Sequence, residues 1–116
     1  MKILLDECVP VRLHQYLPGF EISSVSKEKW TSFKNGKLIN KSISADFELM
    51  ITVDKNLQYQ QNINNYEITI VVFDTLFNRL QDFVPLVPQF LDNLPSMKKK
   101  RVYIGQKLED GSRLDI

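Results

Sequence analysis

Short apolar segments that alternate with helical segments are the feature that most limits how this chain can fold. We predict strands at residues 2–5, 20–25, 49–53, 67–73 and 101–104, and helices at residues 9–17, 35–45, 56–62, a short stretch up to 83, and 85–94. Strands that alternate with helices favour a parallel sheet with helices on both faces. The predicted fold class is therefore α/β: a single-domain, three-layer α/β/α arrangement with a mainly parallel central sheet.

Prolines and a capping residue set several of these helix boundaries. Pro10 falls in the first turn of the first helix, where a missing N–H costs no hydrogen bond. Asn35 is the expected N-cap of the helix over 35–45. Pro85 and Pro88 both fit the first turn of a helix that begins at Pro85, because the first four N–H groups of a helix have no partner within it.

The connections of a parallel sheet limit the order of its strands. Right-handed crossovers favour the order two, one, three, four, five, numbered along the chain. The chain then reverses its direction of travel between strands one and three, and ligands bind beyond the carboxyl ends of strands at such a point. Asp6 and Glu7 follow strand one and Asp54 follows strand three. We therefore expect these acids to meet at one crevice.

Paired acids at a sheet edge indicate a metal site. Neighbouring strand residues point to opposite faces, so we assign Asp6 to the side of Asp54 and place Glu7 at the N-terminus of the next helix. Two carboxylates that lie close together repel each other unless a cation lies between them. Mg²⁺ or Mn²⁺ is the expected cation, and such a centre supports phosphoryl transfer or phosphodiester hydrolysis. The alternative is that all three acids only cap helices.

Two motifs around these acids carry a family resemblance. The chain begins "KILLDECVP" and has "ITVDKNL" near its middle, and it also contains Trp30, "KNG" at 34–36, "QQN" at 60–62 and "NRL" at 78–80. In this order the pieces resemble the PIN-like domains of small bacterial proteins, with their LLDE-type first strand and T-x-D third strand. These domains are relatives of the PIN-domain ribonuclease toxins. The resemblance extends from Met1 to about Leu94.

The resemblance implies a fold, an activity and partners. It implies a PIN-like domain over residues 1–105, a divalent metal ion, RNA as the substrate and a small antitoxin protein as a partner. The expected function is a metal-dependent endoribonuclease of the toxin type. Asp6, Asp54 and Glu7 are its expected catalytic residues, and Asp6 and Asp54 its expected metal ligands.

The chain departs from the PIN pattern at two places. PIN nucleases supply a further acid from the middle helix, where this chain has Asn35 and Lys37, and Asn56 replaces an acid that often follows the strand-three aspartate. Asp74, after strand four, is the remaining candidate carboxylate. These departures favour an alternative, a catalytically silent PIN-like module that binds RNA or a protein.

Six polar residues are candidates for contact with RNA or its phosphates. An exposed lysine or arginine can bind phosphate, and amide side chains can contact sugar or base edges. For each of them a structural role, such as a helix cap, a solvated surface or an ion pair, is the alternative. The six are Lys34, Asn35, Asn56, Gln61, Asn78 and Arg79.

A phospho-acceptor receiver domain is a further alternative. Receivers also place acids after strand one and an aspartate after strand three of a five-stranded sheet. They typically have Thr or Ser at the end of strand four and Lys-Pro after strand five. This chain has Phe73-Asp74 and Gly105-Gln106 there, so the sequence favours the nuclease.

Composition limits the remaining choices. The net charge of +1 gives no overall attraction to nucleic acid or membrane, so any basic patch is local. A single cysteine, Cys8, excludes an intramolecular disulfide, and no apolar run approaches the length of a membrane span. We expect a cytoplasmic protein without a membrane partner, with a polar, flexible tail at 106–116. The apolar residues at 83–87 fit either a homodimer surface or the core.

Overall fold

The computed structural model describes residues 1–54, 68–75, 77–96 and 102–106. The strands are β1 (Lys2–Leu5), β2 (Glu21–Ser24), β3 (Leu49–Thr52), β4 (Thr69–Asp74) and β5 (Val102–Gln106). The helical elements are the 3₁₀ helix η1 (Val11–Tyr16), α1 (Asn35–Ser44), α3 (Leu80–Phe83), the 3₁₀ turn η3 (Val84–Leu86), α4 (Val87–Asn93) and the 3₁₀ turn η4 (Leu94–Ser96). The helix predicted at 56–62 and the tail after Gln106 lie outside the described residues.

The strands form one sheet in the order β2-β1-β3-β4-β5, which is the predicted order. Each neighbouring pair is parallel. Leu5 of β1 pairs with Ile51 of β3, and Thr52 of β3 pairs with Val72 of β4. The carboxyl ends of these central strands therefore lie next to one another at one edge of the sheet.

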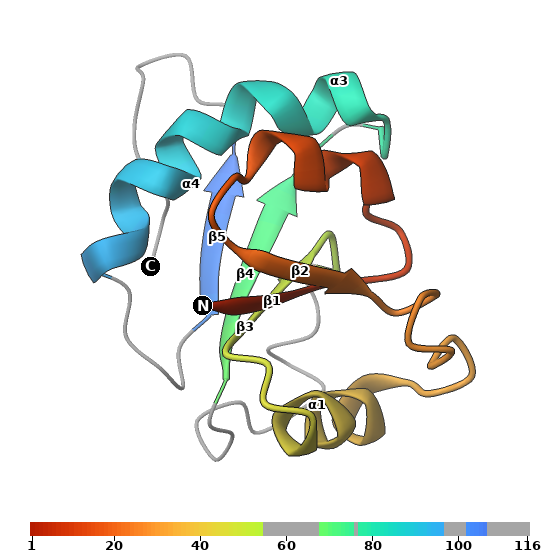
Figure 1. The fold of residues 1–116 in the computed structure, drawn as a ribbon. Helices are drawn as coiled ribbons and strands as arrows, with labels where there is room; N and C mark the ends of the chain where they lie inside the picture. The colour runs from red at the N-terminus through yellow and green to blue at the C-terminus, as the bar shows by residue number, and fades with distance from the viewer. Residues whose placement is uncertain (55–67, 76, 97–101, 107–116) are drawn as a thin grey trace.

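Helices cover both faces of the sheet (Figure 1), and each face has its own apolar core. One core joins alternate residues of β1, β3 and β4 to η1, α3 and α4, with Phe73, Phe83 and Phe90 fully buried. The other joins the intervening strand residues, among them Leu4 and Met50, to α1. This alternation is what strands buried on both faces require. The arrangement is a three-layer α/β/α sandwich.

One helix type and two helix boundaries differ from the sequence prediction. The first helix is 3₁₀ rather than α, because Leu13 and Leu17 donate to the carbonyls of Pro10 and His14, each three residues earlier. Lys34, not Asn35, is the N-cap of α1, because the Lys34 carbonyl accepts the first helical hydrogen bonds. Helix α4 begins at Val87 rather than Pro85, because Pro85 lies in the 3₁₀ turn that links α3 to α4.

Burial places most of the apolar residues at 83–87 in the core. Phe83, Leu86 and Val87 are buried there, whereas Val84 is half-buried. Trp30 is buried and contacts Phe47 edge-on at 5.9 Å between ring centroids. Its role is therefore to pack the loop after β2 against the core.

None of the helices in the described part of the chain has the length and apolar character that crossing a membrane requires.

Candidate functional site

Strand alternation places Asp6 and Thr52 on the α1 face of the sheet. Leu4 and Met50 pack into the core under α1, and the residues two positions further along share their face. The Asp6 N–H donates to the Ile51 carbonyl at 2.9 Å, which extends the β1–β3 pairing to Asp6. The backbone of the sheet therefore sets the position of this carboxylate.

Thr52 connects the two aspartate positions. It is fully buried, its hydroxyl donates to Asp6 Oδ2 at 2.6 Å, and its Oγ1 accepts from the Asp54 N–H at 3.2 Å. The Glu7 N–H donates to the other Asp6 oxygen at 2.7 Å. Sequence reasoning did not assign Thr52 a role of its own, although it is the threonine of the T-x-D motif. The structure makes Thr52 the link between the loop after β1 and the loop after β3.

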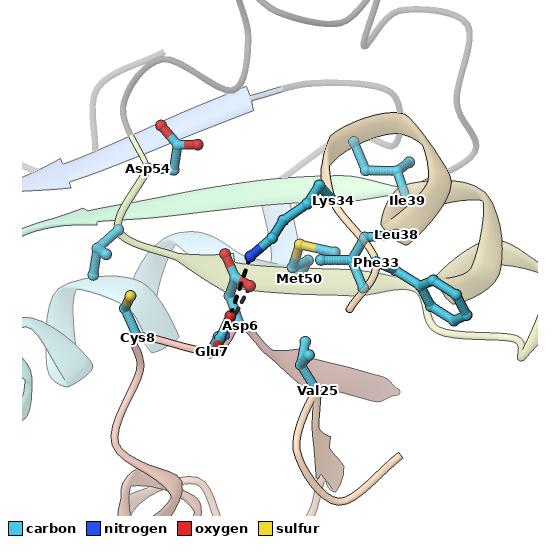
Figure 2. A pocket seen from close by; sticks show the side chains of 11 residues that line it. Asp6, Glu7, Cys8, Val25, Phe33, Lys34, Leu38, Ile39, Met50 and Asp54 are labelled. Atoms are coloured by element: carbon cyan, nitrogen blue, oxygen red, sulfur yellow. Dashed lines mark hydrogen bonds and ion pairs between the residues drawn. The ribbon is translucent and has the colours of Figure 1, made fainter. Parts of the chain in front are cut away.

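A cavity of about 300 Å³ opens beside these residues, between the sheet edge and α1 (Figure 2). Four charged residues line it: Asp6, Glu7, Asp54 and Lys34. The rest of the described lining is Cys8 and apolar side chains, namely Val25, Phe33, Leu38, Ile39, Met50 and Val53. The cavity therefore combines an acidic part with an apolar part.

Glu7 forms an ion pair with Lys34 instead of capping a helix. Glu7 Oε2 and Lys34 Nζ lie 3.7 Å apart, and the two side chains are 52% and 73% exposed. The predicted place of Glu7 at a helix N-terminus is wrong, because η1 starts only at Val11 and has no acid in its first turn. For the same reason, capping of this helix does not account for Asp6. Exposed ion pairs contribute little to stability, so this contact can open readily.

Cys8 is exposed at the edge of the cavity. The chain turns directly after β1, where the Val9 N–H donates to the Asp6 carbonyl at 3.0 Å. Val9 is then buried while Cys8 points outward.

The other candidate residues lie elsewhere or outside the described residues. Asn35 is the first residue of α1, and Asn56 and Gln61 lie outside the described residues. Asp74 ends β4 and is half-buried, opposite Gln106 of β5. It is not among the described residues that line the cavity.

Arg79 is used in a local ion pair at the start of α3. Its Nε and Nη2 donate to Asp82 Oδ2 and Oδ1 at 3.0 and 3.2 Å, and its guanidinium lies 4.8 Å from the centroid of the Phe77 ring. The hydrogen bond to Arg79 lowers the pKa of Asp82, and the same bond raises the pKa of Arg79. Like its exposed neighbour Asn78, Arg79 is not among the described cavity residues. The structure thus gives Arg79 the ion pair that was its alternative role.

The donor set was tested for its fit to a divalent metal ion. In the described ranges, no group of three or more His, Cys, Asp or Glu side chains is placed to hold a metal ion. Asp6 and Asp54 supply two carboxylates, and magnesium accepts one or two, with water and phosphate as further ligands. Each Asp6 oxygen accepts one of the hydrogen bonds above, which leaves further lone pairs for a cation. Carboxylate oxygens are the donor type that magnesium and manganese prefer, with water and substrate as further ligands.

The chain matches no protein-family model, no curated protein and no solved structure.

Proposed function

We propose that this protein is a PIN-like, divalent-metal-dependent ribonuclease that hydrolyses RNA phosphodiesters. The observation that carries the proposal is the joint placement of Asp6 and Asp54 beside one cavity, with Thr52 bonded to both loops. The "LLDECV" and "TVDKNL" motifs, whose resemblance to PIN-like domains suggested this function, supply these three residues. A toxin role with a small antitoxin as partner belongs to the same proposal.

Hydrolysis needs a held cation, a proton acceptor and a phosphate contact. Asp6 and Asp54 would hold Mg²⁺ or Mn²⁺, which when bound activates water and offsets phosphate charge. A water oxygen forms a bond to phosphorus, the P–O3′ bond breaks, and the leaving oxygen takes up a proton. Glu7 accepts the proton of the attacking water, because it is the remaining carboxylate among the described cavity residues. Lys34 exchanges its exposed contact with Glu7 for a phosphate oxygen.

The test compares RNA cleavage by the parent protein with cleavage by carboxylate variants. Structured and single-stranded RNAs are incubated with purified protein in Mg²⁺ or Mn²⁺, and again with EDTA. We expect cleavage that EDTA abolishes, and that Asp6→Asn and Asp54→Asn each lower by about 100-fold or more, because each removes a charged metal ligand. Asp92→Asn is the matched control, since it removes an exposed carboxylate of α4 that does not line the cavity. No cleavage by the parent, or equal cleavage by the site variants, contradicts the nuclease.

Among the described residues no three His, Cys, Asp or Glu side chains are placed to hold one metal ion, and this favours a second candidate, a silent PIN-like module that binds RNA or a protein. Two carboxylates hold one ion, whereas a two-metal centre needs more ligands. This candidate predicts metal-dependent RNA binding without cleavage products. A filter-binding measurement on the same RNAs separates it from the nuclease.

A further inference from the structure

A second cavity, of about 280 Å³, lies on the other face of the sheet from the candidate site. Leu5, Phe20 and Ile22 line it, and all three belong to or pack against the core that joins the sheet to η1, α3 and α4. We propose that this cavity binds a small organic anion, in which a carboxylate or phosphate group is attached to an apolar body. The inference goes beyond the proposed function, because the two cavities have no described lining residue in common.

Two basic side chains line this cavity, and among the described residues no acidic side chain does. Lys27 lies in the loop after β2 and His14 in η1. Lys27 carries a positive charge, and the imidazole of His14 supplies a donor and, when protonated, a second positive charge. In the described part of the chain, neither side chain has a hydrogen-bond or ion-pair partner, whereas Lys2 and Lys34 each have one. An anion in the cavity would supply the missing partner.

The open edge of β2 adds a backbone donor to this cavity. β2 is the first strand of the sheet, so it pairs with β1 on one side and is open on the other. The Val25 N–H donates to the Leu5 carbonyl of β1, and backbone groups alternate in direction along a strand. The N–H of Ser24, a lining residue, therefore points to the open edge.

The same edge favours an anion over an added peptide strand. The Ser24 carbonyl already accepts from the Glu28 N–H at 2.9 Å, so it is engaged within the loop after β2. The Lys27 N–H donates to Ser24 Oγ at 3.0 Å, which ties the backbone that carries Lys27 to the end of β2. A peptide strand needs both donors and acceptors along the edge, whereas an anion needs donors alone.

The apolar part of this cavity is open to a ligand. Val11 is 50% exposed, and Phe20 and Ile22 are half-buried. Val11 and His14 lie on one side of η1, because residues three apart eclipse each other in a 3₁₀ helix. The volume is close to the lower limit of roughly 300 Å³ for small-molecule pockets, so the apolar body is about the size of one ring. Such a ring can cover the three apolar side chains while its anionic group reaches Lys27.

The single histidine and the single tryptophan of the chain are direct probes of binding. Phenylacetate and phenyl phosphate are titrated into the protein in buffer with EDTA, so that no divalent cation contributes. We expect the ring-proton signals of His14 to shift with both ligands. The indole signal of Trp30, which is buried in the core under α1, should stay in place. A His14 signal that does not move with either anion overturns the inference, as does an equal shift of Trp30.

Matched ligands test the two parts of the proposed anion separately. Phenylacetamide keeps the ring but lacks the charge, whereas acetate and inorganic phosphate keep the charge but lack the ring. We expect each of them to bind about fivefold or more weakly than the ring-bearing anion it resembles, because an exposed charge pair and an aromatic contact each contribute at about this level. Equal binding of phenylacetamide overturns the inference. Equal binding of acetate and phosphate overturns it as well, since it shows a non-specific ion contact only.

Variants at exposed positions test the cavity without disturbing the core. Val11→Glu adds a negative charge to the lining, and Val11→Gln is its matched control with the same shape and no charge. We expect Val11→Glu to bind phenylacetate about tenfold more weakly than Val11→Gln, because like charges repel. Lys27→Gln should weaken binding about two- to fivefold, and Lys29→Gln, in the same loop but outside the lining, should not. Equal affinities of the two Val11 variants overturn the inference.

Discussion

Thr52 shows at the scale of one residue how a buried hydroxyl organises the candidate metal site. It donates to Asp6 and accepts from the backbone of Asp54. Thr52→Val keeps the shape of the side chain but removes both bonds. We expect its Mn²⁺ affinity to fall by about 10- to 100-fold, as it does when groups that orient metal ligands are lost. Isothermal titration with Mn²⁺ measures this, and unchanged affinity would exclude the positioning role.

Thr52→Ser is the matched control, because it keeps the hydroxyl and should retain affinity close to that of the parent. Urea unfolding of both variants separates a positioning effect from a loss of fold. If Thr52→Ser loses as much Mn²⁺ affinity as Thr52→Val, the hydroxyl is not what matters.

The position of the two aspartates was predictable, but their surroundings were not. Asp6 and Asp54 follow strands, and strand order alone brings them to one edge. The contact between Glu7 and Lys34 depends on the turn after β1 and on where the loop before α1 runs. No local sequence pattern predicts the conformation of this turn or of this loop. Thr52 looks like an ordinary strand residue until its partner at Asp6, 46 positions away, is known.

At the scale of elements, a pH-sensitive ion pair between Arg79 and Asp82 lies at the start of the short helix α3. Arg79 is its N-cap, and Asp82 also accepts from the Arg79 N–H at 3.2 Å. The pKa of Asp82 is lower in the folded state than in the unfolded state. The ionised carboxylate therefore contributes fully to the free energy of unfolding above the unfolded-state pKa of an aspartate. This contribution is lost as the pH falls through the folded-state pKa. Asp82→Asn should therefore be less stable than the parent at neutral pH and equal to it in acid. Urea midpoints across pH measure the difference, which salt should reduce. A constant difference would contradict this.

The C-terminal end of α1 is held by Lys2 of β1. Lys2 Nζ donates to the Ala45 carbonyl at 2.6 Å and lies 4.5 Å from the centroid of the Phe47 ring. A cation at the C-terminus of a helix also offsets the helix dipole. Lys2→Met keeps the apolar stem and should lower the free energy of unfolding by about 1 kcal/mol. Chemical denaturation measures this, with Lys27→Met, at an exposed position in the loop after β2, as the control.

The elements themselves were predicted unevenly, for a physical reason. Strands such as β3 and β4 are continuous apolar runs, and burial on both faces requires this pattern. A 3₁₀ helix has hydrogen bonds between residues three apart, as in η1, and an α helix has them between residues four apart. The same spacing of apolar residues is compatible with both, so the sequence pattern did not distinguish them. The helix starts in the α3–η3–α4 segment were also difficult to predict. Its prolines limit where a helix can begin, but they are compatible with more than one start.

At the scale of the whole molecule, one sheet separates two cores, and the question is whether they unfold together. Phe73 of β4 lies 5.8 Å from the ring centroid of Phe83 and 5.7 Å from that of Phe90, all on the α3–α4 face. Trp30, the single tryptophan, lies in the core on the α1 face. Phe73→Ala should remove about 3–5 kcal/mol, a large part of the stability of a domain of this size.

If the sheet couples the two cores, this loss lowers the unfolding midpoint equally by Trp30 fluorescence and by far-ultraviolet circular dichroism. Coupling is expected because residues of β3 and β4 alternate between the cores, so neither core can lose its strands alone. Phe77→Ala, at a residue that is 55% exposed, is the control and should leave both midpoints near those of the parent. A Trp30 midpoint that stays at the parent value in Phe73→Ala would show that the α1 face folds independently. The candidate site could then persist while the α3–α4 face is unfolded.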